Sequence, residues 1–144
     1  MLVDRLAQEL ETTPDEIERL LALDATALYD DPGYQAFVDR LRGDVLEATV
    51  AQVRAAYDHG LPEIKARYAL SDTVMSGYTL ANWVLGFMMY PDQMRDMLDR
   101  HRSVPPDVVS ATLPELLDLL DDANVAPEWK HALATFSLPL LAQR

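Results

Sequence analysis

The sequence predicts an all-α fold of orthogonal or bundled helices, and three observations support this prediction. Apolar residues recur every three or four positions along most of the 144 residues, which is the period of an amphipathic helix. No segment alternates apolar and polar residues over more than a few positions, so we expect no β-sheet. Apolar residues make up 49% of the chain, which is enough to fill the core of one domain.

Residues 1–30 are expected to form a hairpin of two helices joined by a short turn, in the manner of a helix-turn-helix. Leu6 and Leu10 lie one helical turn apart and end the first apolar face. Thr13 has a side chain that caps helix N-termini, and Pro14 would then occupy the first helical position, where its missing N–H costs nothing. These residues predict the start of the second helix.

One long helix is expected from residue 34 to about residue 60, after the break at Asp31-Pro32. Its apolar residues form two overlapping stripes, and a helix that is apolar on two sides needs two packing partners. We therefore expect this helix to lie at the centre of the domain or at a subunit interface. The residues expected in that core or interface are Tyr34, Leu41, Val53 and Tyr57.

A buried apolar helix is expected over residues 72–90, because no charged residue occurs from Thr73 to Pro91. Such a run approaches the length of a membrane span. Polar residues and glycines dilute its hydrophobicity, and no basic flank sets an orientation, so we favour a buried helix and expect no membrane association. Its expected core or interface residues are Tyr78, Trp83, Phe87 and Met88.

The pair Pro105-Pro106 is the one credible hinge in the sequence. It divides a main helical domain, residues 1–104, from a C-terminal helical tail, residues 105–144. A short amphipathic helix over residues 92–102 precedes the hinge. The methionines near that helix are interpreted as core filler rather than as an adaptable binding surface.

Two helices are expected in the tail. Thr112 and Glu115 have the spacing of a capping box, which predicts a helix that begins at this point. Pro127 begins the final helix, and Pro139 is expected to stop or kink it. The sequence leaves open whether this tail packs on its own subunit or on a neighbouring one.

The charge balance is strongly acidic, with 24 Asp and Glu residues against 12 Lys and Arg residues and a net charge of −12. The molecule as a whole therefore repels phosphate, and binding of nucleic acid would require a local basic face. Residues 1–31 hold most of the excess, with nine carboxylates and two arginines. The middle of the chain is the least repulsive place for an anion.

No arrangement of residues predicts catalysis. The chain contains no cysteine, and each of its three histidines stands alone, without a second ligand at helical spacing. Neither a glycine-rich phosphate loop nor a nucleophilic serine in a glycine-flanked turn is present. We therefore expect no metal site, no cofactor and no small-molecule substrate, and the chain is not predicted to be an enzyme.

Three sequence patterns follow one another over residues 4–70: Leu6-Ala7-x-x-Leu10, then Thr12-Thr13-Pro14-x-x-Ile17-x-x-Leu20-Leu21, then Asp31-Pro32-x-Tyr34 before the expected long helix. The first two are similar to the second and third helices of a helix-turn-helix, and the third is an acidic-Pro-x-aromatic step. Together they resemble the small terminase subunit of tailed phages. Glu11 stands at the turn position that usually holds glycine.

This resemblance implies a subunit that recognises duplex DNA as a homo-oligomer. The helix that would enter the major groove contains three carboxylates and one arginine, whereas contact with phosphate requires Lys or Arg. The candidate DNA-binding residues are therefore Arg5, Arg19, Arg40, Arg42 and Arg54. In the alternative interpretation these arginines form ion pairs along their own helix, such as Arg40 with Asp44 and Arg54 with Asp58.

Two functional hypotheses follow. The first is a small-terminase-like subunit for DNA packaging, with duplex DNA or phage assembly proteins as its partners. The second is an acidic helical virion, adaptor or assembly-chaperone protein that binds protein through its aromatic and methionine residues and has no affinity for nucleic acid. Residues 1–21 are charged throughout and lack the apolar segment of a secretory signal. We therefore expect a location in the host cytoplasm or the virion rather than secretion.

Overall fold

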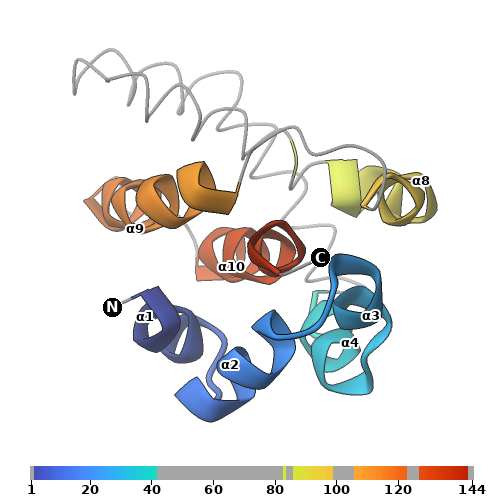
Figure 1. Ribbon diagram of the computed structural model, residues 1–144. Helices are drawn as coiled ribbons and strands as arrows, with labels where there is room; N and C mark the ends of the chain where they lie inside the picture. The colour runs from blue at the N-terminus through green and yellow to red at the C-terminus, as the bar shows by residue number, and fades with distance from the viewer. Residues whose placement is uncertain (1, 42–82, 84–85, 99–105, 123–126, 143–144) are drawn as a thin grey trace.

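The computed structural model describes residues 2–41, 83, 86–98, 106–122 and 127–142, which are coloured in Figure 1. Every regular element among these residues is a helix, and none is a strand. The predicted all-α fold is therefore confirmed. The helices are α1 (Leu2–Glu9), α2 (Pro14–Leu21), α3 (Ala25–Asp30), α4 (Pro32–Asp39), α8 (Pro91–Met97), α9 (Pro106–Asp122) and α10 (Pro127–Leu141).

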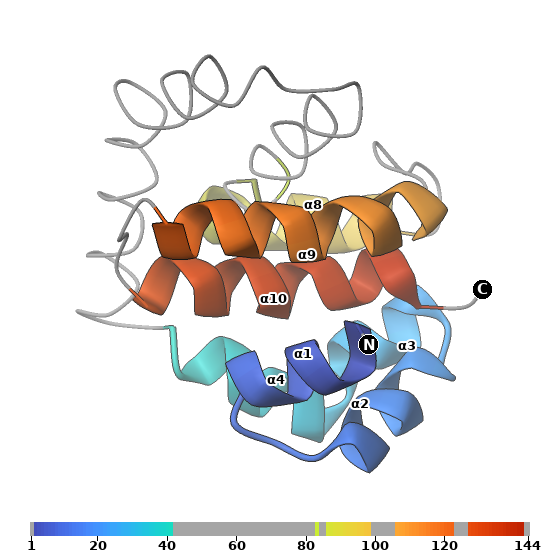
Figure 2. The ribbon, with the colours of Figure 1, turned by 90° about the vertical axis from the view of Figure 1, so that its left-hand side faces the viewer.

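Helix α10 is the centre of the described structure. All residues from 132 to 140 are buried, on every side of the helix, which is typical of a helix enclosed by others. Helix α9 lies along one side of α10, and α1 to α4 cover the opposite side (Figures 1 and 2). The sequence predicted a central helix over residues 34–60 or 72–90. In the described structure the central helix is α10, which belongs to the expected C-terminal tail.

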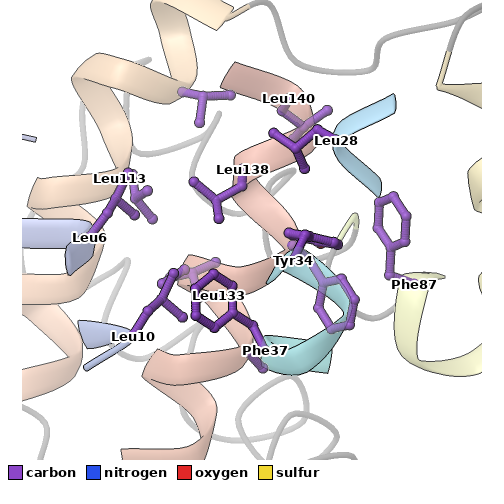
Figure 3. Packing of buried hydrophobic residues seen from close by; sticks show 14 of the residues in the cluster. Leu6, Leu10, Leu28, Tyr34, Phe37, Phe87, Leu113, Leu133, Leu138 and Leu140 are labelled. Carbon is purple, nitrogen blue, oxygen red and sulfur yellow. The ribbon is translucent and has the colours of Figure 1, made fainter. Parts of the chain in front are cut away.

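A single hydrophobic cluster joins helices that are far apart in the chain (Figure 3). Leu6 of α1, Leu113 of α9 and Leu133 of α10 are all fully buried in it. Phe87 stacks on Phe136 of α10, with ring centroids 5.2 Å apart and an angle of 9° between the planes. Residues 106–122 and 127–142 therefore share one core with the N-terminal helices, a placement that the sequence left open.

The turn between α1 and α2 has the hydrogen bonds of a Schellman motif. The N–H of Thr12 bonds to the carbonyl of Ala7, and the N–H of Glu11 bonds to that of Gln8. Glu11 adopts a left-handed φ of 55°, the conformation for which this position usually holds glycine. The expected cap is confirmed, because the Thr13 hydroxyl accepts the N–H of Glu16 at 3.2 Å.

The prediction of one unbroken helix over residues 34–60 is wrong, because the helix that contains Tyr34 ends at Asp39. Helix α4 starts at Pro32 and ends at Asp39, with Arg40 as its C-cap. The N–H of Leu41 turns back to the carbonyl of Val38, and this tight turn places the Leu41 side chain in the core. Hydrophobic periodicity continues through this point, so the pattern alone does not reveal the break. Residues 42–60 lie outside the described part of the chain.

The predicted start of the helix at Thr112 is also wrong. Helix α9 already begins at Pro106 and continues through Pro114 to Asp122. A proline inside a helix removes one backbone hydrogen bond, but burial of Val109, Thr112 and Leu113 on α9 offsets this loss. Helix α10 likewise continues past Pro139 to Leu141. Of the stop or kink expected at Pro139, the stop is therefore not found.

Candidate functional site

The candidate DNA-binding residue Arg19 lies in a cluster of charges between α2 and α4. Its guanidinium contacts Glu16 at 2.6 Å and Asp31 at 2.9 Å. Asp31 also caps α4, because its carboxylate accepts the N–H of Gly33 at 2.8 Å. The Arg19 guanidinium lowers the pKa of both carboxyl groups. The only base of the supposed recognition helix is therefore committed to two carboxylates of its own chain.

Arg5, the second candidate, connects α1 to the C-terminal half of α9. Its guanidinium contacts Asp118 at 2.8 Å, Asp121 at 3.1 Å and Glu9 at 3.3 Å. The Asp118 carboxylate is the main reason that the pKa of Arg5 is raised. Lys130 at the start of α10 also pairs with Asp121. This network fixes three helices to one another.

Arg40, the third described candidate, caps the C-terminal end of α1. Its guanidinium donates to the backbone carbonyl of Leu10 at 2.9 Å and to the Glu11 carboxylate at 3.0 Å. Arg95 of α8 pairs with Asp30 at the end of α3. Among the described residues, every Arg and Lys side chain thus has a carboxylate partner. Arg42 and Arg54 lie outside the described residues.

Many carboxylates of the same segments have no such partner. They lie on α1, α2, α8, α9 and α10, and all are at least partly exposed. The described surface is therefore negative, and no described cation is left to meet a phosphate. The carboxylates of these helices without an ion pair among the described residues are Asp4, Asp15, Glu18, Asp92, Asp107, Glu115 and Glu128, and Asp24, the N-cap of α3, also has none.

The expected core or interface residues that the structure describes are all buried. They lie on α4, at its C-terminal turn and in the segment before α8, and they are Tyr34, Leu41, Trp83, Phe87 and Met88. Val53, Tyr57 and Tyr78 lie outside the described residues. The large apolar side chains that do reach the surface of the described part are Met89 and Tyr90, which are 38% and 55% exposed.

An open pocket of about 390 Å³ lies where three helix ends meet. The last turns of α1 and α4 and the first turn of α10 gather on the same side of the molecule (Figure 2). The pocket is lined by polar and charged side chains together with Leu41 and Pro127. Its other lining residues are Gln8, Glu9, Glu11, Arg40, Glu128, Lys130 and His131.

His131 is one of the residues that line this pocket. Its Nδ1 lies 3.4 Å from the backbone carbonyl of Glu9, and its buried Nε2 has no hydrogen-bond partner in the described part of the chain. Burial is the main reason that the pKa of His131 is lowered, and the Arg40 charge lowers it further. The carbonyls of Glu9 and Phe37 act in the opposite direction. The imidazole is therefore held in its neutral form near neutral pH.

Sequence reasoning missed this pocket entirely. Its residues come from positions 8–11, 40–41 and 127–131, and none of these short segments carries a recognisable motif. No local signal could have identified it, because its lining residues come from three segments that are far apart in the sequence. Arg40 and Leu41, which directly follow α4, belong to this lining.

The described residues show neither a metal site nor a membrane-spanning helix. In the described ranges, no three His, Asp or Glu side chains are grouped as metal ligands. Of the helices given above, none is both long and apolar enough to cross a membrane. Comparison of the chain with protein-family models, with curated proteins and with solved structures gives no match.

Proposed function

We propose that this chain is an acidic helical adaptor or assembly protein that binds a basic partner protein and has no affinity for nucleic acid. The observation that supports this proposal is the pairing of every described Arg and Lys side chain with a carboxylate of the same chain. The remaining carboxylates at the surface then provide the charge that a partner meets. A basic protein complements this surface, whereas the DNA backbone is repelled by it.

The paired arginines weigh against a phosphate-binding role for two reasons. Contact with phosphate would require Arg5, Arg19 or Arg40 to leave carboxylates at 2.6 to 3.0 Å. Each carboxylate left behind would then lie close to the DNA backbone and repel it. The exposed face of α2 adds Asp15 and Glu18 to this repulsion.

Light scattering tests this proposal directly. The mass of the full chain is measured at two salt concentrations, alone, with a duplex DNA fragment and with poly-L-lysine of defined length. We expect a complex with poly-L-lysine that weakens as salt screens the charges, and an unchanged mass with DNA. A mass increase with DNA at moderate salt, or no complex with poly-L-lysine at low salt, contradicts the proposal.

The DNA-packaging hypothesis stays a prediction, and the same experiment addresses it. A closed oligomer whose mass increases with DNA would support a small-terminase-like subunit. In that case Arg42→Ala should weaken DNA binding and reduce its dependence on salt. Binding with one phosphate contact fewer releases fewer counterions from the DNA.

A further inference from the structure

The pocket between α1, α4 and α10 has an uneven charge balance. Glu9 pairs with Arg5, and Glu11 pairs with Arg40. Lys130, the other cation of the lining, pairs with Asp121. Glu128 is the lining carboxylate that has no ion pair among the described residues. One negative charge at the pocket is therefore not compensated by a side chain.

The surroundings of Glu128 do not remove this charge. His131 is held neutral by its burial and adds no positive charge near neutral pH. The C-terminal ends of α1 and α4 border the pocket, and helix C-termini carry partial negative charge. The N-terminus of α10 has the opposite polarity, but a helix dipole amounts to about half an elementary charge. The charged side chains of the lining therefore leave the pocket with an excess of negative charge near neutral pH.

The volume and the lining of the pocket suit a long side chain with a charged end. Its volume of about 390 Å³ falls in the range of about 300–1,000 Å³ that small-ligand sites occupy. Leu41 and Pro127 provide apolar surface in the same lining. Lysine and arginine cover such surface with their methylene groups and keep the charged group at a polar site.

We propose that this pocket receives a lysine or arginine side chain of the basic partner protein, with Glu128 as the carboxylate that binds its cationic group. This inference rests on the proposed function and adds a location to it. Gln8 of α1 provides a further hydrogen-bonding side chain at the same pocket. A guanidinium is planar and carries five N–H donors, so it suits a pocket whose lining holds both a carboxylate and a side-chain amide.

The probe that tests this inference is a tri-arginine peptide blocked at both ends. The peptide is titrated into the isotopically labelled full chain at low salt and near neutral pH, while the backbone amide signals are followed by NMR. We expect the largest shifts at residues 8–11, 40–41 and 127–131. Largest shifts elsewhere, or no detectable binding of the peptide, would overturn the inference.

Glu128→Gln is the decisive variant, and Glu115→Gln on α9 is its matched control. Both glutamates lie on helices and lack an ion pair among the described residues. We expect Glu128→Gln to weaken tri-arginine binding by about fivefold or more and Glu115→Gln to weaken it by less than about twofold. Equal affinities of the two variants would overturn the inference. Amide signals outside α10 should match those of the unsubstituted chain and show that Glu128→Gln remains folded.

The two probes distinguish a wrong assignment of the pocket from a wrong proposed function. If poly-L-lysine binds and Glu128→Gln has no effect on tri-arginine, the pocket is not the site, but the acidic surface still binds a basic partner. If neither probe binds the unsubstituted chain, both proposals are wrong.

Discussion

The hydroxyl of Tyr34 on α4 donates a hydrogen bond to the backbone carbonyl of Thr135 on α10, at 2.8 Å. In a regular helix this carbonyl would accept the N–H of residue 139, but residue 139 is a proline and has no N–H. Burial raises the pKa of the Tyr34 phenol well above its usual value, so the hydroxyl keeps its proton. One helix thus supplies the donor that the central helix lacks.

Tyr34→Phe should lower the free energy of unfolding by about 1–3 kcal/mol, because it leaves the buried Thr135 carbonyl without a donor. Chemical denaturation measures this change. Tyr90→Phe is the control, since Tyr90 is 55% exposed. Equal stabilities of the two variants would show that the buried hydrogen bond contributes nothing.

Pro139→Ala provides a second test of the same relationship. Alanine at this position restores the helical N–H, so Thr135 would have a donor even without the phenol. In the Pro139→Ala background, Tyr34→Phe should therefore cost about half as much or less, giving a coupling of at least about 0.5 kcal/mol in a double-mutant cycle. Additive effects of the two substitutions would argue against this account.

Glu11→Gly should stabilise the protein by about 0.5–1 kcal/mol. Glu11 has a φ of 55°, which costs a residue with a side chain about 1–2 kcal/mol, and its exposed ion pair with Arg40 returns little of this. The comparison is Glu18→Gly on α2, which should destabilise by about 1 kcal/mol, as glycine does inside a helix. Thermal unfolding distinguishes the two. A lower melting temperature for Glu11→Gly would refute the strain at this turn.

Acidification from pH 7 to pH 5 should destabilise the fold through His131. Its pKa is lowered in the folded state, so the unfolded chain binds the proton first. The contribution of neutral His131 to the free energy of unfolding is fully present above the pKa of a histidine in the unfolded chain, about 6.5. It is lost as pH falls below that value, by at most about 1.4 kcal/mol per pH unit. The charged residues that line the same pocket as His131 are Arg40, Glu11, Glu9, Glu128 and Lys130.

His131→Gln isolates this effect. The variant should unfold with a free energy that changes less between pH 7 and pH 5 than that of the unsubstituted chain. The carboxyl groups of Glu16, Asp30 and Asp31 do not interfere, because their lowered pKa values place their own loss of stabilisation below about pH 4.5. Identical pH profiles of the two proteins would exclude His131 as the source.

Leu133→Ala should be among the most disruptive single substitutions, since Leu133 is fully buried at the centre of the core. Truncation of a buried leucine to alanine costs about 2–5 kcal/mol. Leu141→Ala at the end of the same helix should cost less, because Leu141 is half-buried. Comparable losses at the two positions would contradict the deeper burial of Leu133.

The local features of this fold were predictable from the sequence, and the long-range ones were not. The cap at Thr13 and the helix starts at Pro14 and Pro127 depend on neighbouring residues, and the structure has all three. Helix α3 was missed, because its six residues are too few to establish a period. At the end of α4, Arg40 contacts Leu10 and Glu11, and periodicity does not encode such long-range contacts.

The candidate site shows the same division between local and long-range information. The sequence identified Arg5, Arg19 and Arg40 as cations of interest, and spacing suggested partners one helical turn away. Their observed partners include Asp118, Asp31 and Glu11, which are distant in sequence. Which carboxylate an arginine selects depends on how the helices pack, so the charge pattern alone could not decide between a DNA surface and internal pairing.

The central place of α10 has a consequence for synthesis. Helices α1 to α4 are complete at residue 39, whereas α10 begins at residue 127. At about 5–20 residues per second, a ribosome needs roughly 4–17 s to make the intervening segment. During this interval the apolar faces of the N-terminal helices have no central helix to cover them. The core that α10 completes therefore cannot form until residues 127–141 have been made.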